Sequence, residues 1–136
     1  MKSRFLRTAS ALGSAGIMTG GGVMHFVAPR AYVEVIPLFL PFPYPLVYIS
    51  GVGEIAAGVL LALPKTRRIG AWTVIAVLVA IFPANVYMAI RGPREGSGFP
   101  FNSSTALWLR LPLQGALIAW ADRLRKSADM PDTHPV

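Results

Sequence analysis

The chain has 136 residues, of which 54% are hydrophobic and only 14% charged, a balance that excludes a typical soluble domain and fits a single membrane domain. The net charge of +7 comes mainly from short Lys and Arg clusters outside the apolar stretches, without the basic helix face or aromatic-interleaved patch typical of nucleic-acid binding. The absence of cysteine excludes disulfides, thiolate chemistry and iron–sulfur ligation by this chain alone, and its two histidines form no metal-spacing motif.

The first predicted membrane span covers residues 8–28, with His25 as its only ionisable residue. Its many glycines make it less hydrophobic than an ordinary span, and the basic residues before it also suit the n-region of a signal peptide. We expect a retained helix instead, because the apolar stretch is long and no small-x-small cleavage site ends it. The spacing Gly16-x-x-x-Gly20 predicts a face on which another helix packs closely.

The connection that follows, residues 29–44, is unusual because prolines alternate with large apolar side chains. Proline cannot continue a helix and removes backbone donors, so we expect a re-entrant or lid-like element at the outer interface and not a fifth span. Two roles are open for this element: a lipid-facing anchor and the mouth of a pocket.

The second predicted span, Pro45–Leu63, has a single charge at its middle position, Glu54. Its 19 residues are enough to cross the hydrocarbon core. A carboxylate there raises the free energy of membrane insertion by on the order of 3 kcal/mol, so we expect it to have either a partner that stabilises it or a functional role. Gly51 and Gly58 lie on the same helix face as Glu54, which predicts close helix contact and a position for Glu54 inside the bundle.

The third predicted span, Ile69–Ile90, contains no charge. Pro83 removes a backbone donor inside it and predicts a kink. Asn85 lies two residues further on, where it can satisfy backbone groups freed by the kink, so a structural role stands beside its candidacy as a site residue.

The fourth predicted span, Ser104–Ala121, carries Arg110. Gln114 follows one turn later on the same face and can extend a polar network around that arginine. Residues 1–126 then form the membrane domain, and residues 127–136 form a polar cytoplasmic tail.

The orientation follows from the positive-inside rule, which counts Lys and Arg in the short segments that flank the spans. The side shared by both termini and the second loop holds nine of them: Lys2, Arg4, Arg7, Lys65, Arg67, Arg68, Arg123, Arg125 and Lys126. The other side holds three: Arg30, Arg91 and Arg94. We therefore predict an all-α, multi-pass four-helix bundle in the cell (plasma) membrane, with both termini cytoplasmic.

Each predicted span contributes one polar group to the outer half of the bilayer, namely His25, Glu54, Asn85 and Arg110. At about 1.5 Å per residue, all four lie within about 14 Å of the outer surface. Glu54 and Arg110 differ in depth by roughly 5 Å, so one prediction is a bidentate ion pair, either structural or lining a ligand or proton site. The alternative for Arg110 is snorkelling to the outer headgroups.

Several short runs between residues 20 and 91 form a recognisable set: His25-Phe26 with Pro29, Tyr48 to Ile55 with Gly58, Leu63-Pro64 with Arg67, Arg68 and Ala71-Trp72, and Phe82 to Ala89. As a set they resemble the DoxX-like family. The resemblance implies a small four-helix membrane protein, with relatives linked to thiosulfate–quinone oxidoreduction, to a complex with superoxide dismutase and a sulfurtransferase, and to methylamine dehydrogenase maturation. By position, the resemblance implies that His25, Glu54 and Asn85 are motif residues of the family. The lack of cysteine argues against a role in dithiol exchange.

The leading functional hypothesis is an accessory membrane subunit of a redox system, not catalytic alone, whose polar cluster contacts a quinone or similar lipophile. The alternatives are a small proton-coupled transporter or permease and a membrane scaffold for soluble partners. Expected partners are the lipid bilayer, a soluble redox enzyme on the cytoplasmic face and further copies of the chain, with no nucleic acid. The candidate ligand or proton-site residues are Glu54, Asn85, His25, Arg110, Tyr48 and Gln114.

Overall fold

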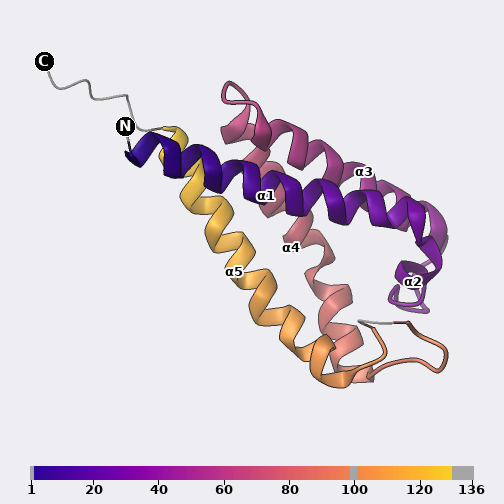
Figure 1. Cartoon of the computed structure of the whole chain (residues 1–136). Helices are drawn as coiled ribbons and strands as arrows, with labels where there is room; N and C mark the ends of the chain where they lie inside the picture. The colour runs from indigo at the N-terminus through magenta and orange to yellow at the C-terminus, as the bar shows by residue number, and fades with distance from the viewer. Residues whose placement is uncertain (1, 99–100, 130–136) are drawn as a thin grey trace, which may run out of the picture.

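The computed structural model describes residues 2–98 and 101–129, and its regular structure over these ranges is entirely helical. The helices, in chain order, are α1 (Lys2–Val27), α2 (Pro29–Val33), α3 (Pro43–Ala62), α4 (Arg67–Arg91) and α5 (Ser104–Ala128) (Figure 1). This part of the chain holds no strand, so the predicted all-α class is confirmed.

The four long helices correspond to the four apolar segments expected from the sequence, although α1 and α3 each end one residue earlier than the expected span. The connection at residues 29–44 forms one short helix, α2, followed by turns. Helix α5 continues to Ala128, into the first residues of the predicted tail. The rest of that tail, residues 130–136, lies outside the described residues.

The ends of the long helices follow local backbone chemistry. Pro43 occupies the first helical position of α3, where its fixed φ suits the helix and its missing N–H costs no bond. Gly92 follows α4 with a φ of 84°, a left-handed conformation that glycine adopts without strain. At the start of α5, the Ser103 hydroxyl accepts a hydrogen bond from the Ala106 N–H and so satisfies a free donor of the first turn.

The helices form two antiparallel pairs that converge near the chain termini. Helix α1 lies along α3, and α4 lies along α5, while α3 also packs on α4 (Figure 1). The α1–α5 contact is smaller and includes a 2.6 Å hydrogen bond that Trp120 Nε1 donates to Ser10 Oγ. Away from the termini the two pairs diverge, and α2 lies at that opposite end (Figure 1).

Most of the buried apolar core belongs to two clusters. The larger takes residues from all four long helices: Ala11, Ala15, Met18, Ala57, Leu61, Ala71, Val74, Leu78, Ala121 and Leu124. The smaller joins the end of α4 to the start of α5 through Met88, Ala89, Phe101 and Leu107, with Tyr32 of α2 packed against it. Small residues dominate the larger cluster, which allows the helices there to approach closely.

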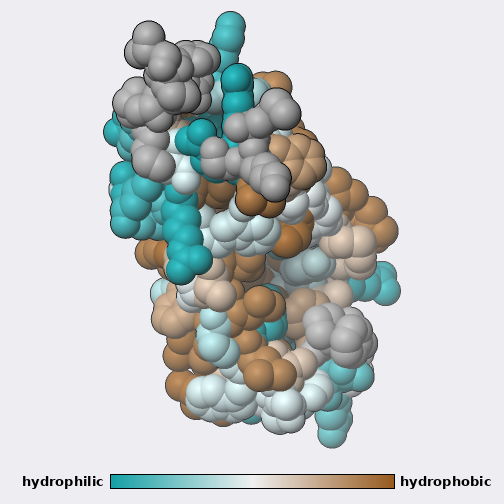
Figure 2. All heavy atoms as spheres, turned by 60° about the vertical axis from the view of Figure 1, so that its left-hand side comes forward, coloured by the Kyte–Doolittle hydropathy of each residue, from teal (hydrophilic) through white to brown (hydrophobic). Residues whose placement is uncertain are grey.

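Two of the described helices, α3 and α4, are long and apolar enough to cross a membrane. Only 33% of the most apolar stretch of α3, and 22% of that of α4, is buried within the protein. Large apolar side chains therefore face outward on both helices, among them Ile49 and Val79. Figure 2 shows the largest hydrophilic area at the end that carries the termini, with mainly apolar surface beyond it.

The close contact between α1 and α3 is made through glycines. A Cβ atom on Gly22 would lie 2.6 Å from the Gly51 carbonyl oxygen, and one on Gly51 would lie 2.8 Å from His25 Cβ. A Cβ atom on Gly58 would lie 2.8 Å from the Ala15 carbonyl oxygen. The prediction that Gly51 and Gly58 allow close contact beside Glu54 is confirmed, since any larger side chain would force the two helices apart.

The prediction that Gly16-x-x-x-Gly20 forms the packing face is wrong. Both glycines are exposed, and no other side chain or distant backbone atom lies within 4 Å of a Cβ built on either. The buried face of α1 instead runs through Ala15, Met18 and Gly22, which recur at helical spacing. Positions one or two residues away from this face point elsewhere, because successive side chains are rotated by about 100°.

The glycine contacts predict unequal effects of a single added methyl group. Gly58→Ala should lower the free energy of unfolding by about 1–3 kcal/mol, because the methyl meets the backbone of α1. Gly16→Ala adds the same methyl in open space, where it should leave stability unchanged or raise it by up to about 1 kcal/mol. The measurement is loss of helical circular dichroism in mixed micelles during a dodecyl sulfate titration. Equal effects of the two substitutions would contradict the packing.

Candidate functional site

The Glu54 carboxylate lies against the backbone of α1. Its Oε2 atom is 2.9 Å from the position that a Cβ on Gly21 would occupy, so a side chain there would displace it. The same oxygen is 3.8 Å from His25 Nδ1, and both residues are buried. Two of the predicted site residues are thus brought together by the α1–α3 contact.

A hydrogen bond determines the tautomer of His25. Its Nδ1 atom lies 2.8 Å from the Gly21 carbonyl oxygen. A carbonyl only accepts, so Nδ1 carries a hydrogen and donates it, and in the neutral ring Nε2 is an acceptor. No described residue forms a hydrogen bond with Nε2. This nitrogen is therefore open to a donor group of a ligand or to a proton.

A line of ring contacts leads from His25 to Arg110 on α5. The Tyr32 ring of α2 stacks on the His25 imidazole, with centroids 3.9 Å apart. Tyr32 also meets Phe101 edge to face at 5.7 Å. The Arg110 guanidinium lies 4.8 Å from the centroid of the Phe101 ring, within cation–π distance. These contacts connect the α1–α3 pair to α5.

The predicted direct ion pair between Glu54 and Arg110 is wrong. These two described residues form no ion pair, although they are close enough for their charges to interact. The contact recorded for the Arg110 guanidinium is instead with the face of the Phe101 ring. The Nη1 atom of Arg110 is buried without a hydrogen-bond partner, which leaves a donor directed into the protein interior.

A second buried polar pair joins α4 to α5. Asn85 Nδ2 donates a 2.7 Å hydrogen bond to Gln114 Oε1, and Gln114 Nε2 donates to the Leu78 carbonyl oxygen. Both side chains are buried. The prediction that Gln114 extends a network from Arg110 is not what the structure records, since the amide reaches across to the neighbouring helix.

The last candidate, Tyr48, lies outside both groups. Its ring is exposed and stacks on Phe26 at 5.3 Å, on the outer side of the α1–α3 pair. Sequence reasoning instead missed Tyr32 and Phe101, which complete the contacts between His25 and Arg110. No local signal marks either residue, because each reaches the cluster from a connecting segment whose path depends on the tertiary fold.

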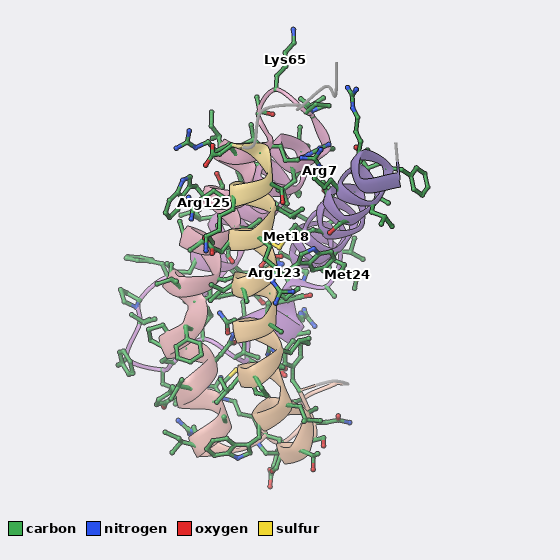
Figure 3. All side chains as sticks on the ribbon, turned by 90° about the vertical axis from the view of Figure 1, so that its left-hand side faces the viewer. Arg7, Met18, Met24, Lys65, Arg123 and Arg125 are labelled. Atoms are coloured by element: carbon green, nitrogen blue, oxygen red, sulfur yellow. The ribbon has the colours of Figure 1, made fainter. Side chains whose placement is uncertain are left out.

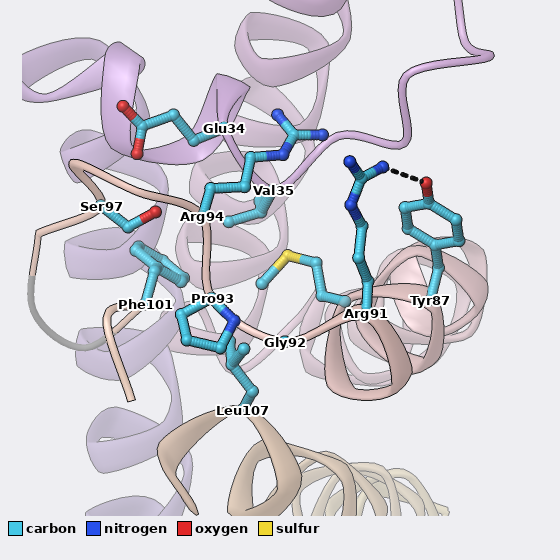
Figure 4. A pocket seen from close by; sticks show the side chains of 11 residues that line it. Glu34, Val35, Tyr87, Arg91, Gly92, Pro93, Arg94, Ser97, Phe101 and Leu107 are labelled. Carbon is cyan, nitrogen blue, oxygen red and sulfur yellow. Dashed lines mark hydrogen bonds between the residues drawn. The ribbon is translucent and has the colours of Figure 1, made fainter. Parts of the chain in front are cut away.

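A small pocket opens at the end of the molecule opposite the termini, where α2, α4 and α5 meet. Figure 4 shows Glu34 and Val35 on one side of it and Phe101 on the other. Close by, Arg91 donates a 2.8 Å hydrogen bond to the Tyr87 hydroxyl. The connection at residues 29–44 thus lines a pocket with its first part. Its later part exposes large apolar side chains at Leu38, Phe39, Leu40 and Phe42.

The described residues contain no group of three or more His, Cys, Asp or Glu placed to hold a metal ion. The small pocket is lined by none of the six candidate residues. The groups of the Glu54 cluster are suited to hydrogen bonding and proton exchange. It combines one carboxylate, one imidazole with a free nitrogen, and a cation held by an aromatic ring.

The Asn85–Gln114 bond predicts non-additive effects on stability. Asn85→Leu and Gln114→Leu should each destabilise the protein, and the double variant should lose less than the sum, by roughly 0.5–2 kcal/mol. The reason is that either substitution already removes the shared bond. Unfolding in dodecyl sulfate measures the cycle. Pairing Gln114→Leu with Thr73→Val, whose hydroxyl bonds only within α4, serves as the additive control. Additivity in both cycles would contradict a contribution from this bond.

Comparison with known proteins adds a family assignment. No curated protein and no solved structure matches the chain. One family does match, and it covers residues 14–125, a range that includes α2, α3, α4, nearly all of α5 and all six candidate residues. Since the match spans most of the sequence, the chain belongs to the family described as Domain of unknown function (DUF8561).

Proposed function

We propose that the chain is an integral membrane four-helix bundle in which α1, α3, α4 and α5 all cross the bilayer. Each of these helices has 20 to 26 residues, and about 20 suffice to span the hydrocarbon core. Apolar side chains also face outward on the two less hydrophobic helices, for example Ile17 on α1 and Leu113 on α5. Exposed apolar surface of this extent is a liability in water and is favourable in lipid.

The proposed orientation has both termini in the cytoplasm. Its support is the nine Lys and Arg on the side of the termini against three on the other side. The hydrophilic area in Figure 2 lies at the same end. With this orientation, the His25–Glu54 pair belongs to the outer half of the bilayer, and the cell membrane is the proposed location.

Cysteine accessibility tests the orientation cleanly, because the chain has no cysteine of its own. Lys65→Cys, between α3 and α4, should react with a membrane-impermeant maleimide only in inverted vesicles. Glu95→Cys, between α4 and α5, should react only in intact cells. Labelling of both positions from the same side would contradict a crossing of the bilayer by α4. Reversed labelling would overturn the orientation.

For the activity, we propose a DoxX-like accessory subunit of a membrane redox system that binds a quinone or similar lipophile beside Glu54. The observation that carries this proposal is the buried Glu54–His25 couple within apolar helices. The Glu54 carboxyl, when protonated, can donate a hydrogen bond to an oxygen of a quinone ring, and the free Nε2 of His25 can accept one from a hydroxyl of the reduced quinol. The stacked ring of Tyr32 adds a flat apolar surface of the kind on which such a ring packs.

Native mass spectrometry with an added short-chain ubiquinone or its reduced quinol tests the activity proposal. Wild type in mild detergent should retain the quinone and its reduced quinol, and Glu54→Gln should bind the quinol about tenfold more weakly, because the charge-assisted hydrogen bond from a quinol hydroxyl to the carboxylate is lost. Glu95→Gln makes the same chemical change at an exposed site and should behave as wild type. Helical circular dichroism of each variant verifies folding.

Failure of wild type to retain quinone or quinol, or equal quinol binding by Glu54→Gln, would contradict the proposed site. The functional search would then move to a scaffold role, with soluble partners on the basic cytoplasmic end. That alternative has its own support in the concentration of Lys and Arg at this end.

A further inference from the structure

A larger pocket lies at the end of the molecule that carries the termini, and none of the residues of the Glu54 cluster lines it. It opens between the start of α1, the α3–α4 connection and the end of α5, with an empty volume of about 690 Å³ including its open mouth. Its charged lining residues are Arg4, Arg7 and Arg67, and none of the described residues that line it is acidic. Thr8 and Ser127 add hydroxyl groups to the wall. The pocket is therefore strongly cationic.

Arg67, which lines this pocket, carries an unused hydrogen-bond donor. Its Nε atom donates a 3.1 Å hydrogen bond to the Leu61 carbonyl oxygen at the end of α3, which holds the guanidinium in place. Its Nη2 atom is buried and has no hydrogen-bond partner. A buried guanidinium nitrogen without an acceptor is unusual in a folded protein, and an anion in the pocket would supply that acceptor.

The start of α4 adds a second feature that favours an anion. Arg67 is the first residue of this 25-residue helix. The N-cap residue, Thr66, donates its hydroxyl to the Leu60 carbonyl oxygen at 2.9 Å and makes no capping bond to the first turn of α4. The first-turn N–H groups thus lack a side-chain cap, and the helix dipole places partial positive charge there.

Two acidic side chains of the described residues at this end form ion pairs with cations that do not line the pocket. Asp122 contacts Arg125 and Lys126, each at 2.7 Å, and the hydrogen bonds from Lys126 and then Arg125 hold the pKa of the Asp122 carboxyl below its usual value. Asp129 lies 3.1 Å from Arg68. Those two acidic groups are thus compensated by surface cations that do not line the pocket.

We propose that this pocket binds a phosphate group, with Arg67 and Arg4 as its principal ligands. Planar guanidinium groups match phosphate oxygens in geometry and charge. The phosphate has two sources, an anionic phospholipid headgroup of the inner leaflet and a free phosphate ion of the cytoplasm. This site is separate from the proposed quinone site and does not depend on it, whereas the two named sources rest on the proposed orientation in the membrane.

Binding is measured on the full chain in an uncharged maltoside detergent, with three probes: dioleoylphosphatidylglycerol, dioleoylphosphatidylcholine and inorganic phosphate. The readouts are lipid retention in native mass spectrometry and the thermal unfolding midpoint. The test variants are Arg67→Gln and Arg4→Gln, which should each weaken binding about tenfold by removing a charge-assisted bond. Arg4 is exposed, so Arg4→Gln keeps the test informative if Arg67→Gln fails to fold.

Lys65→Gln and Arg123→Gln are the matched controls, because each removes one exposed positive charge at a residue that does not line the pocket. Figure 3 shows Lys65 at the tip of this end, pointing away from the helices. Both controls should change binding less than about twofold.

Phosphatidylglycerol bound in preference to phosphatidylcholine, with the arginine dependence above, would support a lipid headgroup as the ligand. Inorganic phosphate bound with the same dependence would support a free anion. No binding of either anionic probe to wild type would overturn the proposal. Equal losses in the control variants would overturn it too, since they would reduce the effect to general surface charge.

Discussion

The close approach of α1 and α3 is the constraint on which the rest of the structure depends. Gly22, Gly51 and Gly58 let the two backbones come near enough that no side chain fits between them. The Glu54 carboxylate can then lie on the backbone at Gly21, and His25 lies beside it. A glycine contact is thus what converts a lone acid in an apolar helix into one member of a polar couple.

Each antiparallel helix pair contains one such couple, and each couple is tied to a backbone carbonyl. His25 donates to Gly21 in the first pair, while Gln114 donates to Leu78 in the second and accepts from Asn85. In apolar surroundings a polar side chain without a partner is costly, so these bonds favour one register of each pair. The ring contacts of Tyr32 and Phe101 then connect the two pairs.

The two proposed sites differ in the physics of binding. Beside Glu54 the surroundings are apolar, and a ligand would be recognised by a few hydrogen bonds and by stacking. At the end that carries the termini the pocket is open and its charged lining residues are cationic, so recognition there would be electrostatic and sensitive to salt. A membrane protein that holds a headgroup at one end and a lipophile near the other would contact the bilayer at two depths.

The sequence alone determined the helical class, the four long apolar segments and the burial of Glu54, because hydropathy, length and small neighbours are local properties. It could not determine which face of α1 packs, since Gly16 and Gly20 have the same spacing as a true interface but lie about 100–200° around the helix from it. The ion pair predicted between Glu54 and Arg110 rested only on their similar depth in the bilayer. Only the tertiary structure decided that Phe101 covers the arginine and His25 meets the acid, because such contacts depend on how helices rotate and how connections return.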